Sequence, residues 1–186
     1  DPDGPVADLI RRILVLLADH ELNASTFAAR VTASTGASLA AAVLSGLATL
    51  SGPRHGGMGA MVRDLAEHAA THGALAAVAA RLAKGDPLPG FGHPLYPKGD
   101  IRAKVILEQI AVLAVFAELL AAARDAGQGE PNVDFALAAA SAAYSIPDDA
   151  PFLLFATART AGWLAHAIEQ GASGRLIRPR ARYVGP

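Results

Sequence analysis

Long segments rich in alanine and leucine run through this chain, and none of them alternates strictly between apolar and polar residues. This pattern favours helices over strands, because alanine and leucine have high helix propensity and a half-buried strand needs a period of two. Apolar residues make up 52% of the 186-residue chain and charged residues 18%, which is enough for a large core. We therefore predict an all-α fold.

The breaks in this pattern predict six helices. Residues 85–100, with the sequence GDPLPGFGHPLYPKGD, form a loop because their four prolines cannot continue a helix. Asp100 is the expected N-cap of the helix that follows this loop. The basic tail 175–186 is expected to be extended. The predicted helices span 6–18, 25–50 with a bend at Gly36 or Gly46, 58–84, 102–126, 132–144 and 151–170.

The composition excludes several classes of protein. With 16 basic and 17 acidic residues, the chain has no concentrated positive charge for nucleic acid or an anionic membrane. Cysteine is absent, which excludes disulfides, thiolate metal sites and cysteine nucleophiles. The apolar stretch 13–18 is far shorter than the roughly 20 residues that span a bilayer, and the N-terminus lacks signal-peptide features. These observations predict a cytoplasmic protein with no membrane partner.

Two predicted helices are nearly apolar on all sides, in the segments AELLAAARDA and ALAAASAAY. A helix of this kind packs on more than one face or against another subunit. The sequence therefore predicts an oligomer.

Three histidines, His20, His55 and His93, lie at predicted helix ends or in loops, beside glycine or within a few residues of asparagine. Unpaired backbone groups at such places can face a ligand, and a histidine near a helix N-terminus can stabilise developing negative charge. The alternative for each one is a capping or core histidine.

The remaining histidines are interpreted as structural or solvent-exposed. His68 and His72 share one face of a predicted helix and could seat a metal, but no third ligand is recognisable, so a solvated helix face is favoured and no metal site is predicted. His166, inside the last helix, is expected to be structural.

One acid and three arginines complete the candidate set. Asp134 lies in the first turn of a predicted helix, where it either compensates the helix dipole or, if desolvated, abstracts a proton. Arg159 interrupts an apolar helix and needs an anionic partner or a route to water. Together with Arg102 and Arg178, these side chains suit a small dicarboxylate, which guanidinium groups bind through paired hydrogen bonds. Spacing alone does not show that they meet.

Five segments together resemble the signature segments of the citrate synthase family: DHELNASTFAARV, LSGPRHGGMGAMV, PGFGHPLYPKGDIRA, PNVDF, and ARTAGWLAH with RLIRPRARYVGP. The resemblance covers nearly the whole chain and identifies it as the C-terminal half of a family protein. It implies an all-helical homodimer that condenses acetyl-CoA with oxaloacetate to give citrate and CoA, with the coenzyme A thioester as co-substrate and no permanently bound cofactor.

The resemblance also implies roles for particular residues. Asp134 would remove a proton from the acetyl methyl group, His55 would stabilise the enolate, and His93 would bind the oxaloacetate carbonyl. The substrate carboxylates would be held by His20, Arg102 and Arg159, and Arg178 would reach the site of the partner subunit. Coenzyme A would contact Leu88, Pro89, Gly90, Phe91, Gly92 and Asn132.

The implied domain arrangement has residues 1–55 in a large helical domain, 56–150 in a small domain, and 151–186 returning to the large domain. Departures from the family pattern surround the site: HGGMGAM replaces the more usual HGGANEA, and Ile101 replaces a proline. Two alternatives remain, a 2-methylcitrate synthase that uses propionyl-CoA and a non-catalytic helical binding protein derived from the family. The 186-residue piece by itself is expected to be inactive if half of the large domain lies elsewhere.

Overall fold

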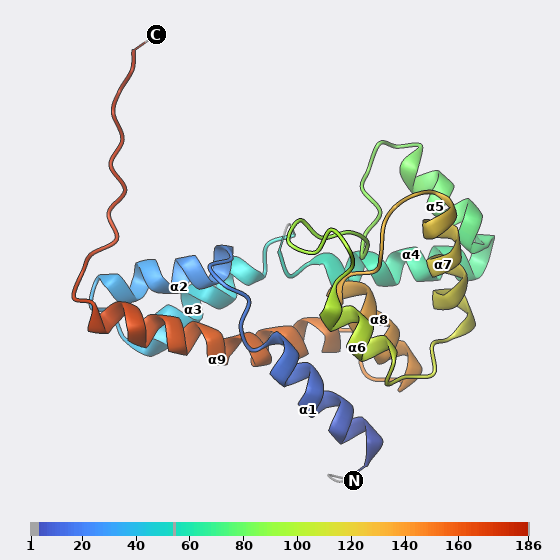
Figure 1. Ribbon diagram of the computed structural model, residues 1–186, viewed down its shortest axis with the longest axis horizontal. Coiled ribbons are helices and arrows are strands. Elements are labelled where there is room, and N and C mark those ends of the chain that lie inside the picture. Colours follow the sequence, from blue (N-terminus) through green and yellow to red (C-terminus); the bar gives the residue numbers. More distant parts are fainter. Residues whose placement is uncertain (1–3, 54, 186) are drawn as a thin grey trace.

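The computed structural model describes residues 4–53 and 55–185 of the chain. Within these residues the fold is all-α, as predicted, with nine helices and no strand (Figure 1). A single isolated bridge pairs Phe91 with Pro131. The helices are α1 (Pro5–Leu17), α2 (Ala24–Ser34), α3 (Leu39–Leu50), α4 (Met58–His72), α5 (Ala74–Leu82), α6 (Ile101–Leu107), α7 (Ala114–Asp125), α8 (Val133–Ala143) and α9 (Ala150–Ala172).

Side-chain caps begin four of these helices. Asp100 accepts a hydrogen bond from the backbone N–H of Arg102 at the start of α6, which confirms the predicted cap. Asn23, Ser38 and Asn132 do the same at α2, α3 and α8. Each cap pairs one of the backbone donors that the first turn of a helix leaves free. The caps therefore fix where the loops that carry the candidate site residues enter their helices.

Three of the predicted long helices are broken. The predicted helix 25–50 divides at Gly36, which has a φ of 82°, and the predicted helix 58–84 divides at Gly73, with a φ of 86°. Both values lie in the left-handed region, which favours glycine. Gly46 does not bend α3. It lies against the ring of Trp163, where any side chain would collide.

The third break had no sequence signal. The predicted helix 102–126 ends at Leu107, and α7 begins only at Ala114. The intervening segment contains no glycine or proline, but Ile110 and Val112 pack against a cluster of buried residues that lie mainly on α4, α5, α7 and α8. Packing of these two side chains outside a helix overrides the local helix preference.

Two hydrophobic clusters form the core. The first lies among α1, α2, α3, α6 and α9, and the second among α4, α5 and α7. Helix α8 contributes residues such as Leu137 to the first cluster and Phe135 to the second, and it lies between the two groups of helices in Figure 1. The division into domains at residues 55 and 150 stays a prediction. Across the described part of the chain, no helix combines the length and apolar character needed to cross a membrane.

Candidate functional site

Two of the predicted histidines come together around a tyrosine. His20 lies between α1 and α2, whereas His93 and Tyr96 lie in the loop before α6. The Nε2 atom of His20 is 2.9 Å from the hydroxyl oxygen of Tyr96. The ring centroids of His20 and His93 are 5.4 Å apart, and those of His93 and Tyr96 are 5.0 Å apart. Residues distant in the sequence therefore form one side-chain cluster.

The loop fixes which nitrogen of His93 can donate a hydrogen bond. The backbone N–H of Leu95 donates to the Nδ1 atom of His93 over 3.1 Å. Burial, and then the charge of Arg102, lower the pKa of His93, so the ring is neutral at pH 7. A neutral imidazole that accepts at Nδ1 carries its proton on Nε2. His93 is therefore prepared to donate from Nε2 to an oxygen atom.

Arg102 borders this cluster. Its guanidinium carbon is 5.1 Å from the centroid of the Tyr96 ring. Its Nε and Nη2 atoms donate to the two carboxylate oxygens of Asp100 over 2.9 and 2.7 Å. Both side chains of this pair are buried. The Nη1 edge of the fork remains for another acceptor.

Asp134 lies at the start of α8, two residues after Asn132, which contacts the loop that contains Gly90 and Gly92. Asn132 links the two segments: its backbone N–H donates to the oxygen of Gly90 over 2.8 Å, and its side-chain amide donates to the oxygen of Gly92 over 3.0 Å. Gly90 has a φ of 83°, and a Cβ atom there would lie 3.0 Å from the Cβ atom of Phe135 on α8 and 2.7 Å from a methyl group of Val62 on α4. The loop can therefore approach α8 this closely only with glycine at this position.

The environment of Asp134 makes it a stronger base than an ordinary aspartate. Burial is the largest influence and raises its pKa. The positive charge of Arg102 lowers the pKa and the negative charge of Asp100 raises it, and the net pKa is about 6. At pH 7 the carboxylate is mostly ionised and can accept a proton.

His55 lies between α3 and α4 and contacts a buried serine. Its Nε2 atom is 2.9 Å from the hydroxyl oxygen of Ser25, which also accepts from the indole N–H of Trp163 over 3.1 Å. Ser25 donates its own proton to the side-chain oxygen of Asn23. In this arrangement the Nε2–H of His55 donates to Ser25. If the serine proton turns toward His55, the ring proton moves to Nδ1, which then becomes the donor.

Arg159, on α9, is almost completely buried. Its Nε atom donates to the backbone oxygen of Leu17, and its guanidinium carbon is 4.9 Å from the centroid of the Phe155 ring. Its Nη2 atom is buried and has no hydrogen-bond partner among the described residues. Burial and then the charge of Arg102 lower the pKa of Arg159 to about 10, so it stays charged at pH 7.

The charges of Arg102 and Arg159 reach all three predicted histidines. Burial and then Arg102, Arg159 and His93 lower the pKa of His20 to about 4. Burial and then Arg159 lower the pKa of His55. The site at pH 7 thus combines neutral histidines with two buried guanidinium groups, which suits an anionic ligand.

Other predicted residues lie apart from this cluster. Arg178 is exposed in the extended tail after α9, which Figure 1 shows leading away from the helices. His68 and His72 are exposed on α4 with ring centroids 4.5 Å apart, and no group of three metal-ligating side chains occurs in residues 4–53 and 55–185. His166 contacts Asp19 and Arg30 over 3.2 and 3.1 Å.

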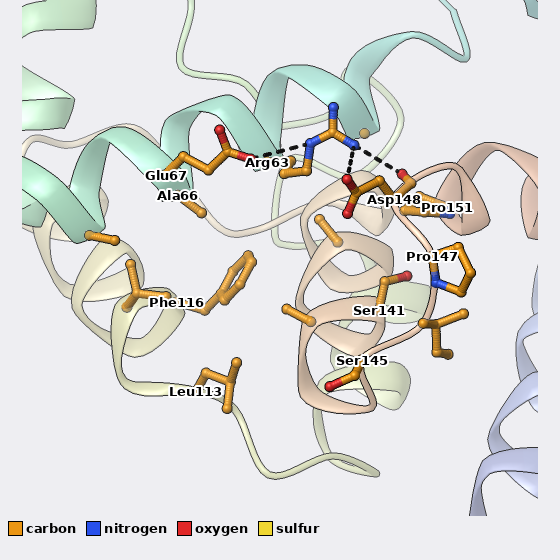
Figure 2. Close-up of a pocket in the computed structure, with 16 residues that line it drawn as sticks. Arg63, Ala66, Glu67, Leu113, Phe116, Ser141, Ser145, Pro147, Asp148 and Pro151 are labelled. Atoms are coloured by element: carbon orange, nitrogen blue, oxygen red, sulfur yellow. Dashed lines mark hydrogen bonds and ion pairs between the residues drawn. The ribbon is translucent and has the colours of Figure 1, made fainter.

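A separate cavity of about 680 Å³ lies between α4, α8 and the loop before α9 (Figure 2). Phe116 and Leu113 form part of its apolar wall, and Arg63 pairs with Glu67 and Asp148 at its rim. No predicted catalytic or substrate-binding residue lines it. The candidate site is therefore distinct from this cavity.

Tyr96, Ser25 and Trp163 were not among the predicted site residues. Tyr96 contacts His20 and Ser25 contacts His55, both of which were predicted, and Trp163 contacts Ser25. Tyr96 had a usable signal, because it lies in the same loop as His93. Ser25 and Trp163 had none, since their contact joins segments far apart in the chain.

Nearly the whole chain is similar in sequence to known proteins. Residues 1–180 match the family described as citrate synthase, C-terminal domain. Citrate synthase 2 of Bacillus subtilis is 36% identical over 197 residues, covering 100% of this chain and 53% of the relative. The 2-methylcitrate synthase of Mycobacterium tuberculosis is 34% identical, covering 99% of this chain and 50% of the relative.

Solved structures show the same likeness. Citrate synthase from Thermotoga maritima superposes with a TM-score of 0.85 at 32% identity, covering 98% of this chain and 54% of that one. The Thermoplasma acidophilum enzyme, in a ternary complex with carboxymethyl coenzyme A and oxaloacetate, gives a TM-score of 0.83 at 30% identity, covering 98% and 53%. This chain spans about half the length of the curated relatives that it matches.

Proposed function

Because this chain belongs to the citrate synthase family, we propose that the protein condenses acetyl-CoA with oxaloacetate and releases citrate and CoA. One observation carries the proposal. Neutral histidines and the buried guanidinium groups of Arg102 and Arg159 share one electrostatic neighbourhood, with the basic carboxylate of Asp134 nearby. This combination fits an anionic 2-oxoacid beside a carbon acid that must lose a proton.

The first step is enolisation of the thioester. Asp134 takes a proton from the acetyl methyl group, and the electron pair of that C–H bond forms the enolate. His55 donates a hydrogen bond to the thioester oxygen as its negative charge develops. The tautomer with the proton on Nδ1 permits this donation, and Ser25 supports that tautomer when its proton turns toward His55.

The second step forms the new carbon–carbon bond. The enolate carbon attacks the oxaloacetate carbonyl carbon, and the carbonyl oxygen becomes an alkoxide. His93, with its proton on Nε2, donates to that oxygen. Water then cleaves the citryl thioester, which releases citrate and the thiol of CoA.

Binding of the two substrates is assigned to different groups. His20, Arg102 and Arg159 hold the carboxylates of oxaloacetate, for which Arg159 has its unpaired Nη2 atom available. The loop from Leu88 to Gly92, together with Asn132, contacts coenzyme A. The ternary complex of the Thermoplasma acidophilum relative supports this pair of substrates, since it contains oxaloacetate and a coenzyme A derivative. No resident cofactor or metal is needed.

Assembly belongs to the same proposal. Helix α3 exposes Leu39, Leu44 and Leu47, an apolar face suited to a second subunit of a homodimer. Arg178 then acts in the site of the partner subunit. A small domain at residues 56–150 closes over the substrates and excludes water until hydrolysis.

A second acyl substrate is supported by the 34% identity to a 2-methylcitrate synthase. Propionyl-CoA differs from acetyl-CoA by one methylene group, so the same residues serve both reactions. The alternative of a non-catalytic binding protein rests on the altered residues that follow His55.

Thiol release tests these alternatives. The full-length gene product is mixed with oxaloacetate and either acetyl-CoA or propionyl-CoA, and the CoA thiol is measured with a disulfide reagent. We expect the wild-type protein to turn over and Asp134→Ala to abolish turnover. Asp148→Ala, at the rim of the separate cavity, should leave turnover unchanged. A wild-type rate no higher than that of Asp134→Ala would refute catalysis, and the ratio of the two acyl substrates decides between the enzymes.

A further inference from the structure

Tyr96 is placed by its loop to face the candidate site. It is the only residue of segment 94–98 that is not exposed. Gly92 and Gly99 flank this segment with φ values of 69° and 110°, in the region that glycine adopts readily. The backbone N–H of Tyr96 donates to the oxygen of His93 over 3.0 Å, which closes the turn. The turn thus presents one aromatic side chain inward.

The hydroxyl group and the ring of Tyr96 contact different site residues. The hydroxyl oxygen is 2.9 Å from the Nε2 atom of His20. The ring centroid is 5.1 Å from the guanidinium carbon of Arg102 and 5.0 Å from the ring centroid of His93. The hydroxyl bond fixes the rotation of the His20 ring, which has no other side-chain hydrogen bond among the described residues.

Arg102 is constrained on two sides. Asp100 takes hydrogen bonds from its Nε and Nη2 atoms, and its guanidinium carbon lies over the ring of Tyr96. A cation–π contact with the ring does not take up an N–H group as a hydrogen bond would, so Nη1 can still donate. The Nη1 edge is therefore the direction in which Arg102 can bind an anion.

We propose that Tyr96 is a positioning residue that orients His20 through its hydroxyl group and Arg102 through its ring, so that both receive one carboxylate of a small 2-oxo dicarboxylate. The identity of that ligand rests on the proposed function. The contacts of Tyr96 with His20 and Arg102 do not, because they join side chains of this chain to one another.

Two variants test separately the contact of the hydroxyl with His20 and the contact of the ring with Arg102. Tyr96→Phe removes the hydroxyl and keeps the ring, so it frees His20 and keeps the cation–π contact with Arg102. Tyr96→Leu removes both contacts. We expect the KM for oxaloacetate to rise about three- to tenfold in Tyr96→Phe, the size expected of one neutral hydrogen bond. A further rise is expected in Tyr96→Leu, and the KM for acetyl-CoA should stay within about twofold in both.

A readout without substrate tests the hydroxyl contact directly. Nitrogen-15 NMR of the ligand-free protein reports which ring nitrogen of His20 carries the proton. We expect one defined tautomer in the wild type and shifts toward a tautomer mixture in Tyr96→Phe. Tyr144→Phe is the matched control, since the Tyr144 hydroxyl makes no hydrogen bond in the described part of the chain.

The outcomes separate the two proposals. Unchanged His20 nitrogen shifts in Tyr96→Phe would overturn the positioning role, whatever the enzyme does. A proportional rise of both KM values would mean that Tyr96 only supports the fold, and would also overturn it. If the wild type fails to bind oxaloacetate but the His20 shifts still respond to Tyr96→Phe, the proposed function fails and the orienting contact stands.

Discussion

Asp100 and Arg102 form a buried ion pair in which both carboxylate oxygens accept hydrogen bonds from the guanidinium group. The same carboxylate accepts the backbone N–H of Arg102 and that of Val133, the first residue of α8. One aspartate therefore caps α6, orients a predicted substrate-binding arginine and ties the loop to the helix that bears Asp134. Burial by itself raises the pKa of Asp100, but the bonds and charge of Arg102 outweigh it, and the pKa lies below its ordinary value.

Replacing Asp100 by asparagine should destabilise the protein. Asp100→Asn keeps a cap but leaves the charge of Arg102 buried without its counterion, and breaking such a pair costs about 3 kcal/mol or more. Urea unfolding measures the change. Lys104→Gln is the control, because the Lys104–Glu108 pair is exposed and its loss should change stability by less than about 0.5 kcal/mol. Equal effects of the two substitutions would contradict the role given to Asp100.

The pKa of Asp134 predicts a pH-dependent stability. Between its ordinary value of 3.8 and about 6, the unfolded chain releases this proton while the folded chain keeps it. The free energy of unfolding therefore falls as pH rises through this window. Asp134→Asn lacks this titration, so its stability relative to the wild type should increase between pH 4 and 7, by at most on the order of 3 kcal/mol. Urea unfolding across this range checks it, and parallel curves for the two proteins would refute the raised pKa.

Substitution by alanine should have opposite effects on stability at two glycines inside helices. A Cβ atom at Gly46 would lie 2.6 Å from Cδ2 of Trp163, whose indole N–H is held by Ser25. Overpacking should outweigh the gain in helix propensity, so Gly46→Ala should cost about 1–2 kcal/mol. At Gly171 a Cβ atom meets nothing within 4 Å, so Gly171→Ala should stabilise by about 0.5 kcal/mol. Thermal melting of both variants measures the signs, and a stabilising Gly46→Ala would show that the Trp163 contact is looser than described.

Local sequence signals predicted the parts of the fold that depend on local chemistry. The cap at Asp100 and the proline-rich loop before it were predicted because a capping side chain and a proline ring both act on the backbone within a few residues. The break between Leu107 and Ala114 was missed, since it depends on where Ile110 and Val112 find a hydrophobic partner. Helix propensity carries no information about that partner.

The candidate site shows the same limit. His20 and Tyr96 are 76 residues apart in the sequence, and no spacing rule indicates that their side chains form a hydrogen bond. Residue types alone suggested a set of side chains for a small dicarboxylate, and the family resemblance supplied the role of each one. Tyr96 was missed although it shares a loop with His93, because that position does not show that its hydroxyl meets His20.

Arg159 is the sharpest test of the proposed carboxylate site, and this prediction rests on the proposed function. Its Nη2 atom is buried and lacks a partner in the described residues, so a ligand carboxylate can supply the missing acceptor. Arg159→Leu in the full-length protein should raise the Kd for oxaloacetate about 10- to 100-fold, the size of one charge-assisted hydrogen bond. The Kd for coenzyme A should change less than about twofold by this reasoning, since its predicted contacts lie in other segments. Titration calorimetry measures both.

Arg63→Leu, at the rim of the separate cavity, is the control, because it removes the same charge without touching the site. It should leave both Kd values unchanged. Equal weakening of the two ligands by Arg159→Leu would mean that Arg159 supports the fold rather than holding the 2-oxoacid.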